Sequence, residues 1–398
     1  MVVLPPDFVQ LMHEHYDTAT ADALCEALQT TDPDVSVRLN TRKLPVADML
    51  AEHPDYEQVP WCDKAFYLPL RPAFTFDPLL HAGAYYVQEA ASMYVAEVLR
   101  QFMPEDHPLV ALDLCAAPGG KSTLAESLLP DDSLLISNEP IAKRTQILAE
   151  NMHKWKQPRH GEAMTGATCL VTQNYPIEFG GLTNSVDVLI TDVPCSGEGM
   201  FRKDEGAIRD WSLDAVAMCS ERQRAILQDI RHVLRPGGLL IYSTCTFNRH
   251  EDEENARWIC DEMDGTLLTE RHFLPGRDRG EGFYVAAIRI GGKWAAQDMS
   301  SIGGHAKKAR RTLRVLYDSE STPLPDGPAI ELTYVEALQY LRREALRVEA
   351  PRGPVTLCYQ GLVLGPGKGV GNRINNLYPE PWRIRSGYTT PFSLMPID

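Results

Sequence analysis

The chain contains 398 residues, 44% of them hydrophobic and 23% charged, which predicts a globular protein of two or three domains. The net charge of −15 counts against nucleic-acid binding by the chain as a whole, because contacts with phosphates need Lys and Arg. The nine cysteines show no CxxC or Cys/His ligand spacing, so neither a disulfide framework nor a zinc site is indicated. No run approaches the ~20 apolar residues of a membrane span. The first residues, MVVLPPDFVQ, do not resemble a signal peptide.

The first part of the chain predicts a small α+β module over residues 1–84. Apolar side chains recur at helical spacing in residues 6–30, and those of VSVRL (35–39) alternate like a half-buried strand. Arg38 and Asn40 fall on the opposite face of this strand, for which a solvent-facing side is the simplest interpretation.

From about residue 85 to residue 290, apolar strand-like runs alternate with helix-like segments. This alternation predicts a doubly wound, mostly parallel sheet whose ligands sit beyond the carboxyl ends of the strands. The predicted strands are VALDL, LLISN, TCLVT, VDVLITD and LLIYST, with a last pair around GTLLTE and GFYVAAIRI.

A glycine-rich turn follows the first of these strands, in VALDLCAAPGGKS (110–122). Such a turn presents backbone N–H groups to a ligand, and Glu139, eighteen residues past Lys121, is placed to bind ribose hydroxyls. The pattern GKS (120–122) also fits the second half of a P-loop, but Cys115 stands where its first glycine should be. A nucleotide hydrolase is therefore a weaker alternative than a protein that binds S-adenosyl-L-methionine.

Two cysteines close two other predicted strands: Cys195 in TDVPCSGEG and Cys245 in YSTCTF. A thiolate is the strongest nucleophile that a protein carries, so two thiols at this edge of the sheet indicate covalent chemistry. The alternative for each cysteine alone is an unreactive core residue.

Beyond the core, GGKWAAQDMSSIGGHAKK (291–308) has the composition of a linker. Residues 309–398 then predict a second α+β module, with strand-like TLRVLY and VTLCYQGLVL around the helix-like YVEALQYLRREALRV. Residues 301–398 hold 13 Lys/Arg and 9 Asp/Glu, net +4, which leaves 26 against 45, net −19, for residues 1–300. This local excess of positive charge is compatible with a narrow RNA-binding stripe.

The motifs CAAPGGKS, TDVPCSGEGMFRKD and YSTCTFNRHEDEEN together resemble the Sun/nucleolar-protein family of RNA 5-methylcytosine methyltransferases, in particular its bacterial branch acting on 16S ribosomal RNA (type F). The resemblance covers residues 85–290 strongly and the flanks weakly. It implies a Rossmann-like S-adenosylmethionine methyltransferase core at 85–290, an RNA-positioning module at 1–84 and a PUA-like RNA-binding module at 309–398. A non-catalytic RNA-binding or ribosome-assembly factor that keeps this fold is a further alternative.

The resemblance also assigns roles to four residues. Cys245 would attack carbon 6 of cytosine, and Cys195 would assist product release. Asp192 would act as acid or hydrogen-bond partner at the N3/N4 edge of the base. Lys121 would lie near the methionine carboxylate or the target base.

The cofactor set implied by the resemblance is Cys115, Ala116, Ala117, Pro118, Gly119, Gly120, Lys121, Glu139, Gln173 and Asp192. The chain departs from the family in VTQNYPIEF (171–179), where Tyr175 stands at the position of an aspartate that holds the adenine. Gln173 or Asn174 could supply an amide hydrogen bond instead, and the sequence does not choose between them.

Four residues are candidates for contact with RNA: Arg202 and Lys203 after GEGMF, and Arg38 and Asn40 in the first module. The expected partner is small-subunit ribosomal RNA or its particle, with no membrane and no metal. We expect a cytoplasmic monomer. The sequence does not identify which cytosine is modified.

Overall fold

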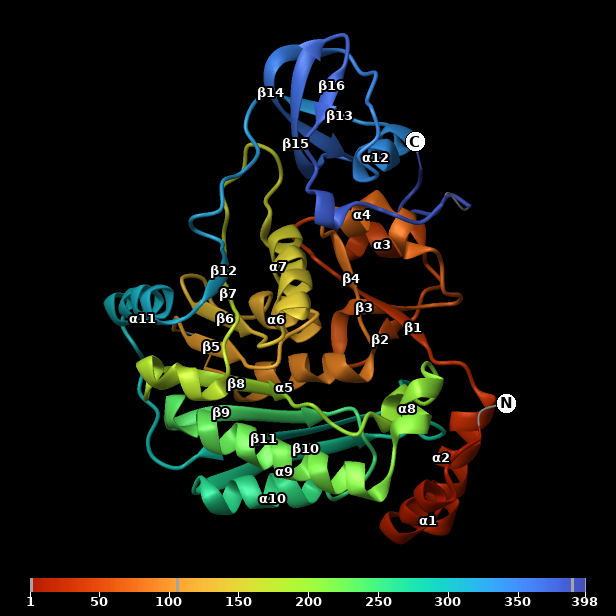
Figure 1. Cartoon of the computed structure of the whole chain (residues 1–398), viewed down its shortest axis with the longest axis vertical. Coiled ribbons are helices and arrows are strands. Elements are labelled where there is room, and N and C mark those ends of the chain that lie inside the picture. Colours follow the sequence, from red (N-terminus) through yellow and green to blue (C-terminus); the bar gives the residue numbers. More distant parts are fainter. Residues whose placement is uncertain (1–2, 105–106, 388–389, 398) are drawn as a thin grey trace.

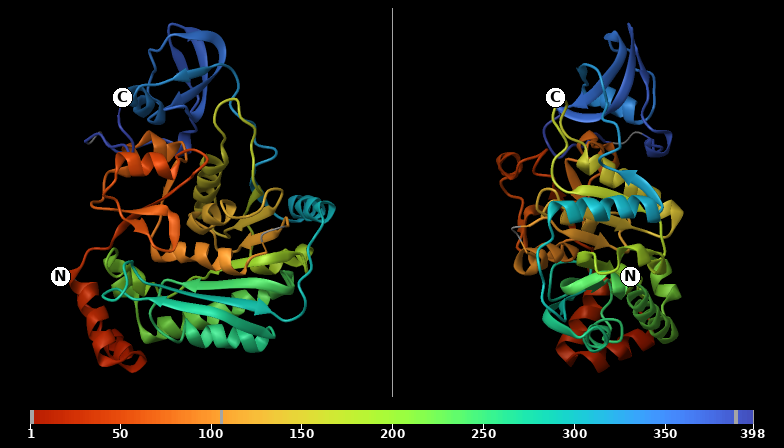
Figure 2. Two further views of the ribbon diagram at one scale, coloured as in Figure 1. Left: turned by 180° about the vertical axis from the view of Figure 1, so that it is seen from behind. Right: turned by 90° about the vertical axis from the view of Figure 1, so that its left-hand side faces the viewer.

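The computed structural model describes residues 3–104, 107–387 and 390–397. An eight-stranded sheet with its helices fills the lower part of Figure 1. A four-stranded sheet near the N-terminus lies beside it, and a second four-stranded sheet forms the top. The views in Figure 2 show the same three parts from behind and from the side. None of the described helices is long and apolar enough to span a bilayer.

The large sheet confirms the predicted doubly wound core. Five strands run parallel, and antiparallel strands extend the sheet at both edges. In sheet order the strands are β10 (Gly265–Phe273), β11 (Phe283–Ile290), β9 (Leu234–Thr244), β8 (Val186–Asp192), β5 (Val110–Asp113), β6 (Leu134–Asn138), β7 (Thr168–Thr172) and β12 (Val315–Asp318).

Helices cover both faces of this sheet because its central strands are apolar on both sides. On one face, α5 (Val95–Phe102), α6 (Gly120–Glu126) and α7 (Ala142–Lys156) contribute to one hydrophobic core, and α9 (Leu213–Ile230), α10 (Glu253–Glu262) and α11 (Met299–Thr312) contribute to another on the opposite face. The order of the parallel strands reverses between β5 and β8. Loops that diverge at such a point form the usual ligand crevice of an open α/β sheet.

The N-terminal module contributes to three different cores. Its sheet has the order β2 (Gln58–Val59), β3 (Cys62–Leu68), β1 (Val35–Leu39), β4 (Tyr85–Val87), and it carries α3 (Val46–Glu52) and α4 (Pro78–His81). The helices α1 (Pro6–His15) and α2 (Thr18–Thr30) pack instead under the loops that follow β8 and β9. There the Phe8 ring lies 5.1 Å from the Phe201 ring and 5.5 Å from the Trp211 ring.

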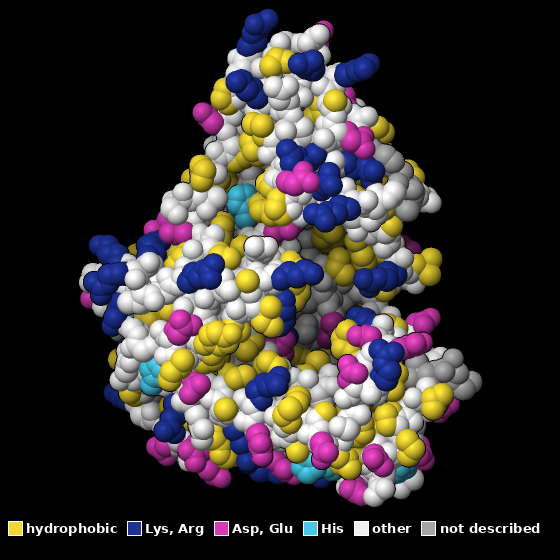
Figure 3. Space-filling model, viewed as in Figure 1, with side chains coloured by type: hydrophobic (Ala, Val, Ile, Leu, Met, Phe, Trp, Pro, Cys, Tyr) yellow, Lys and Arg dark blue, Asp and Glu magenta, His cyan; other side chains and the backbone are white. Residues whose placement is uncertain are grey.

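The C-terminal module packs against the N-terminal sheet, with which it shares a hydrophobic core. Its elements are β13 (Ala329–Glu331), α12 (Tyr334–Leu341), β14 (Ala350–Tyr359), β15 (Leu362–Gly371) and β16 (Ile374–Asn376). On the face shown in Figure 3, Lys and Arg side chains are frequent over this module, whereas Asp and Glu side chains are frequent along the opposite end of the molecule.

The structure differs from the linker predicted at 291–308, because α11 occupies the second half of that segment. Asp298 caps the helix, and Ile302, Ala306 and Ala309 lie buried along one side of it. The strand that follows, β12, pairs with β7 and so completes the core sheet rather than opening the C-terminal module. Glycines give this segment the composition of a linker, but Gly303 and Gly304 lie on the open side of the helix, where a side chain would meet nothing within 4 Å.

Candidate active site

Two loops bring the predicted thiols together at the carboxyl ends of β8 and β9. The Sγ atoms of Cys195 and Cys245 lie 3.2 Å apart. The register of the parallel strands fixes this meeting, since Asp192 of β8 is paired with Ser243 of β9 just before the two cysteines. A further backbone bond, from Gly199 N to Cys245 O at 2.9 Å, joins the two loops beyond the sheet.

The two thiols differ in their surroundings. The pKa of Cys195 is raised well above the ordinary value, first by its hydrogen bond with Cys245 and then by burial. A thiol held in its neutral form can donate its S–H to the neighbouring sulfur. This arrangement suits Cys245 as the nucleophile and Cys195 as its neutral partner.

An ion pair lies beside the cysteines. Lys121 Nζ is 2.9 Å from Asp192 Oδ2 and lies 4.8 Å from the centroid of the Phe283 ring. Ser243 Oγ donates to the other carboxylate oxygen of Asp192 at 3.0 Å. Burial alone would lower the pKa of Lys121, but the facing Asp192 carboxylate raises it above the ordinary value, so the lysine stays charged. The pair can therefore present both a cation and an acceptor to a bound base.

A cavity of about 180 Å³ adjoins this pair, at the reversal point between β5 and β8. The predicted residues that line it are Cys115, Ala116, Ala117, Pro118, Gly120, Lys121 and Asp192. Gly119 lies directly before α6 with a φ of +119°, a backbone conformation that favours glycine, and this allows the turn before the helix. Six further lining residues were not assigned from the sequence: Tyr86, Val87, Gln88, Glu89, Ser92 and Asp113.

The chemistry of the cavity fits a zwitterionic nucleoside cofactor. Lys121 supplies a cation, whereas Asp113 is fully buried with one carboxylate oxygen that has no partner. Glu139, which does not line this cavity, follows β6 and is 2% exposed; it accepts from Ile141 N at 3.0 Å and faces Arg144 at 3.1 Å. A carboxylate at this position can bind ribose hydroxyls.

The structure distinguishes the two amides that could replace the missing adenine contact. Asn174 is 5% exposed, and its Oδ1 already accepts from Arg314 N at 3.0 Å. Gln173 donates to Pro140 O at 3.3 Å, and its Oε1 has no partner. Gln173 therefore retains a free acceptor beside the loop that carries Glu139. Tyr175 is 65% exposed.

A buried network behind the cysteines was not found from the sequence. Glu198 accepts from Trp211 Nε1 at 2.9 Å and from the backbone N–H of Phe247, while Glu251 accepts from Ser196 N at 3.0 Å. Asn248 donates to both carboxylates at 2.9 Å. Burial raises the pKa of Glu198 to about 7. Both glutamates lie inside the quoted motifs, but nothing in their spacing shows that they tie the two cysteine loops together.

Asp252, Glu253 and His272 are spaced as metal ligands can be, within the described part of the chain. His272 Nε2 lies 3.0 Å from Asp252, and Nδ1 lies 3.4 Å from Glu253. Burial would lower the pKa of His272, yet its two acidic partners raise it to about 10. A protonated imidazole offers no lone pair, so this group forms an ionic cluster at ordinary pH.

The structure corrects the prediction that Arg38 and Asn40 face solvent or RNA. Arg38 is 2% exposed, stacks 4.5 Å from the centroid of the Trp155 ring, and donates to Gln88 Oε1 and Thr123 Oγ1. Asn40 is 1% exposed and donates to Gly83 O and Trp155 O. The face opposite the apolar residues of β1 is covered by α6 and α7, which strand alternation cannot reveal.

The two other RNA candidates remain at the surface. Lys203 forms an ion pair with Glu281, and Arg202 donates to Thr31 Oγ1 at 3.1 Å and to Gly280 O. These contacts hold the loop after Cys195 against its neighbours. Contact with RNA stays a prediction for both residues.

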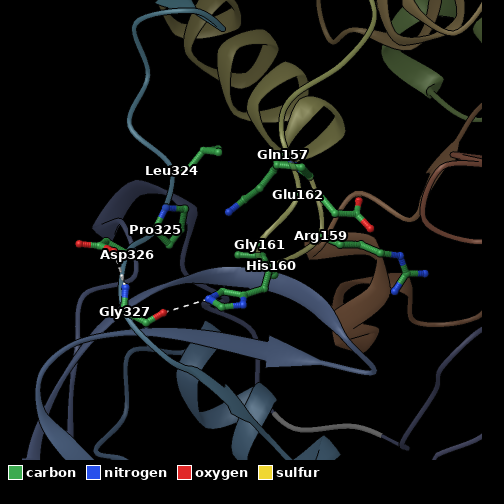
Figure 4. Close-up of a pocket in the computed structure, with 11 residues that line it drawn as sticks. Gln157, Arg159, His160, Gly161, Glu162, Leu324, Pro325, Asp326 and Gly327 are labelled. Carbon is green, nitrogen blue, oxygen red and sulfur yellow. Dashed lines mark hydrogen bonds between the residues drawn. The ribbon is translucent and has the colours of Figure 1, made fainter.

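A second cavity, of about 290 Å³, lies away from the cysteines, between the loop after α7 and the segment before β13 (Figure 4). None of the predicted site residues lines it. His160 Nε2 and Gly327 O are 2.9 Å apart across it, so this loop is fastened to the C-terminal module.

Comparison with known proteins gives three matches along the chain. A family described as 16S rRNA methyltransferase RsmB/F matches residues 100–289. The N-terminal domain of 16S rRNA methyltransferase RsmF matches residues 4–90, and the methyltransferase RsmF PUA domain matches residues 328–384.

Relatives named ribosomal RNA small subunit methyltransferase F occur in several bacteria. The protein of Salmonella arizonae is 34% identical over 285 residues, which are 64% of this chain and 56% of that protein. The chain thus matches little more than half the length of this relative. The protein of Vibrio parahaemolyticus is 28% identical over 444 aligned residues, covering 86% of this chain and 90% of that protein.

Solved structures share the fold. A methyltransferase homolog from Pyrococcus horikoshii aligns with a TM-score of 0.56 and 24% identity, over 72% of this chain and 100% of its own. NSun6 from the same organism aligns with a TM-score of 0.59 and 18% identity, over 72% and 98%. The three consecutive family matches together make the chain similar to RsmB/F-type 16S rRNA methyltransferases along most of its length.

Proposed function

We propose that this protein transfers a methyl group from S-adenosyl-L-methionine to carbon 5 of a cytosine in small-subunit ribosomal RNA. The observation that carries the proposal is the pair of sulfur atoms 3.2 Å apart, next to the Lys121–Asp192 ion pair and the cavity of about 180 Å³. Carbon 5 of cytosine is too weak a nucleophile to take the methyl group directly. A covalent adduct with a thiolate would make carbon 5 nucleophilic enough to react.

Bound S-adenosylmethionine supplies an electrophilic methyl group on its sulfonium. Cys245, once its thiol proton has left, forms a bond from Sγ to carbon 6 of the cytosine. The ring electrons then make carbon 5 an enamine nucleophile, which would take the methyl group as its bond to the sulfonium sulfur breaks and neutral S-adenosylhomocysteine leaves. Loss of the carbon-5 proton to a base and cleavage of the S–C6 bond return the thiolate and release 5-methylcytosine.

The other site residues support these steps. Asp192, oriented by Lys121 and Ser243, would accept hydrogen bonds from the N3/N4 edge of the base. Cys195 keeps a neutral thiol against Cys245 and assists the expulsion of the product. Lys121 orients Asp192 and holds positive charge beside the ring.

The substrate class rests on the relatives' names and on the net positive charge of residues 301–398. We include in the proposal a small-subunit RNA or its particle as partner, a monomeric enzyme and a cytoplasmic location. A P-loop-like hydrolase is disfavoured because the turn before α6 lacks the first P-loop glycine.

Bisulfite sequencing of small-subunit RNA tests the proposal directly. A deletion strain should lose at least one protected cytosine, a plasmid copy of the gene should restore it, and a Cys245→Ala copy should not. Binding of radiolabelled S-adenosylmethionine, with no binding of ATP, is expected from the purified chain. Unchanged protection in the deletion strain would refute the assigned substrate.

A further inference from the structure

A row of cavities follows α7, the helix that runs from the core towards the C-terminal module (Figure 1). The first cavity, of about 300 Å³, shares Tyr86 and Val87 with the cavity of about 180 Å³ described above. Lys154 of α7 lines the first cavity, and its Nζ lies 5.6 Å from the centroid of the Trp382 ring. Trp382 in turn lines the second cavity, of about 360 Å³. The row therefore begins beside the site of the proposed reaction.

The second cavity continues into the cavity of about 290 Å³ that is drawn in Figure 4. Both are bounded by the end of α7 and by the segment between β12 and β13. The residues that line both are Gln157, Leu324, Pro325 and Asp326. These volumes lie near the lower limit of small-ligand pockets, roughly 300 Å³, so they suit single planar groups rather than a docked protein.

Two buried polar atoms that line these cavities have no partner. Gln157 is 5% exposed, its Nε2 has no acceptor, and Figure 4 shows its amide turned towards Pro325. In the first cavity, His81 Nε2 lies 2.8 Å from Thr75 O, to which it must donate, whereas Nδ1 is unpaired. Burial lowers the pKa of His81 to about 3, so its Nδ1 is an acceptor at ordinary pH. Buried polar atoms are nearly always paired, so the row offers one unused donor and one unused acceptor to a ligand.

The charges along the row do not favour a phosphate. Lys154 is paired with Glu150, and Arg159 shares its cavity with Glu162. A phosphate needs an excess of positive charge, whereas an unpaired base needs an aromatic face and polar partners for its edge. The half-buried ring of Trp382 supplies such a face in the cavity that Gln157 also lines. The row therefore fits nucleobases.

We propose that a single-stranded segment of the substrate RNA, next to the target cytosine, lies along α7 with one unpaired base between Gln157 and Trp382. The Gln157 amide donates to the edge of this base, and the Trp382 ring covers its face. Because the row is continuous with the cavity beside Lys121, its occupant is the strand that carries the target rather than a separate ligand. This inference rests on the proposed function and adds that the RNA is unpaired on one side of the modified cytosine.

Gln157→Leu tests the inference, because it removes the amide and keeps a side chain of similar size. Since Nε2 has no partner in the protein, the variant should be at least as stable as wild type in thermal unfolding. Gln157→Met replaces it if it does not fold. Fluorescence anisotropy measures the affinity for RNA oligonucleotides that contain the modified cytosine and are shortened stepwise from either end.

Gln157→Leu should bind the longest oligonucleotide about fivefold more weakly than wild type, the value of one hydrogen bond. This difference should vanish once the nucleotide that reaches Gln157 has been removed. The kcat at saturating RNA should stay the same, because Gln157 does not contact the target base. Gln228→Leu, at an exposed glutamine of α9 on the opposite face of the sheet, is the matched control and should bind every length like wild type.

A complementary strand annealed to the flanking segment should also abolish the fivefold difference, because a paired base cannot enter the cavity. If Gln157→Leu binds the longest RNA like wild type, or if the difference persists at every length, the inference is overturned. Binding of a nucleoside monophosphate that is lost in Gln157→Leu, without any effect on RNA affinity, assigns the cavity to a free nucleotide and also overturns it. If wild type methylates none of these RNAs, the proposed function itself fails.

Discussion

Cys195 and Cys245 are 3.2 Å apart but are not interchangeable. The hydrogen bond with Cys245 and burial raise the pKa of Cys195, so its thiol stays protonated. Sequence spacing predicts that both thiols reach one edge of the sheet, but the division of roles between them came only from the resemblance. The contact between the two sulfur atoms is symmetric, so the division of roles stays a prediction.

Lys121→Met should reduce turnover by about 10²-fold, because Asp192 loses the cation that orients it beside the base. Single-turnover methylation of RNA measures this effect. Lys293→Met, a change at an exposed lysine between β11 and α11, is the control and should leave the rate unchanged. A Lys121→Met enzyme with the wild-type rate would show that the ion pair has no part in the reaction.

At the scale of elements, buried polar side chains fasten segments that lie far apart in the sequence. Arg38 of β1 connects the N-terminal sheet to the first turn of α6 through Thr123 and the Gly120 carbonyl. His272 of β10 connects that strand to the start of α10. Both contacts lie behind the loops that form the site.

Arg38→Met should lower the free energy of unfolding by about 3 kcal/mol, since Gln88 and Thr123 lose a buried donor. Urea unfolding followed by tryptophan fluorescence measures it. Arg352→Met, at an exposed arginine of β14, should change stability by less than about 0.5 kcal/mol. Equal stability of the two variants would contradict the structural role of Arg38.

His272→Gln should destabilise the protein in a pH-dependent way. The folded-state pKa of about 10 lies above the ordinary 6.5, so the stabilisation is complete below pH 6.5 and is lost as the pH rises through 10. Near pH 6 the variant should be about 3 kcal/mol less stable than wild type, and the difference should shrink towards pH 10. A difference that does not vary with pH would show that the imidazole is neutral in the folded protein.

Much of the core could be predicted, because its strands are continuous apolar runs in the sequence and the quoted motifs begin where several of these runs end. The helix α11 could not, since the adjacent Gly303 and Gly304 and the polar residues around them mask the helical spacing of the buried Ile302 and Ala306. Arg38 was placed on the correct face of its strand, but a period of two cannot reveal what covers that face. Asp113 has no sequence signal beyond its place at a strand end.

For the whole molecule, the three modules support one site rather than separate ones. The C-terminal module shares a core with the N-terminal sheet, and α1 and α2 support the loops after β8 and β9. Lys and Arg side chains are frequent over the C-terminal module on the face of Figure 3. Arg352, Lys368 and Arg373 of this module are exposed.

A triple variant in which Gln replaces each of these residues should bind RNA about tenfold more weakly. The slope of log K against log salt should become smaller by about 2, because the counterions released contribute roughly 0.7 per phosphate contact. Fluorescence anisotropy over a salt series measures both quantities. Arg257→Gln, at an exposed position of α10, is the control. An unchanged slope would place the RNA on another surface.

The central claim is that Cys245 forms a covalent bond with cytosine, and a denaturing gel tests it most directly. Cys195→Ala, mixed with small-subunit RNA and S-adenosylmethionine, should accumulate a protein–RNA adduct that survives denaturation. The Cys195→Ala/Cys245→Ala double variant should form none. An adduct that persists without Cys245, or that never forms with Cys195→Ala while methylation proceeds, would contradict the account.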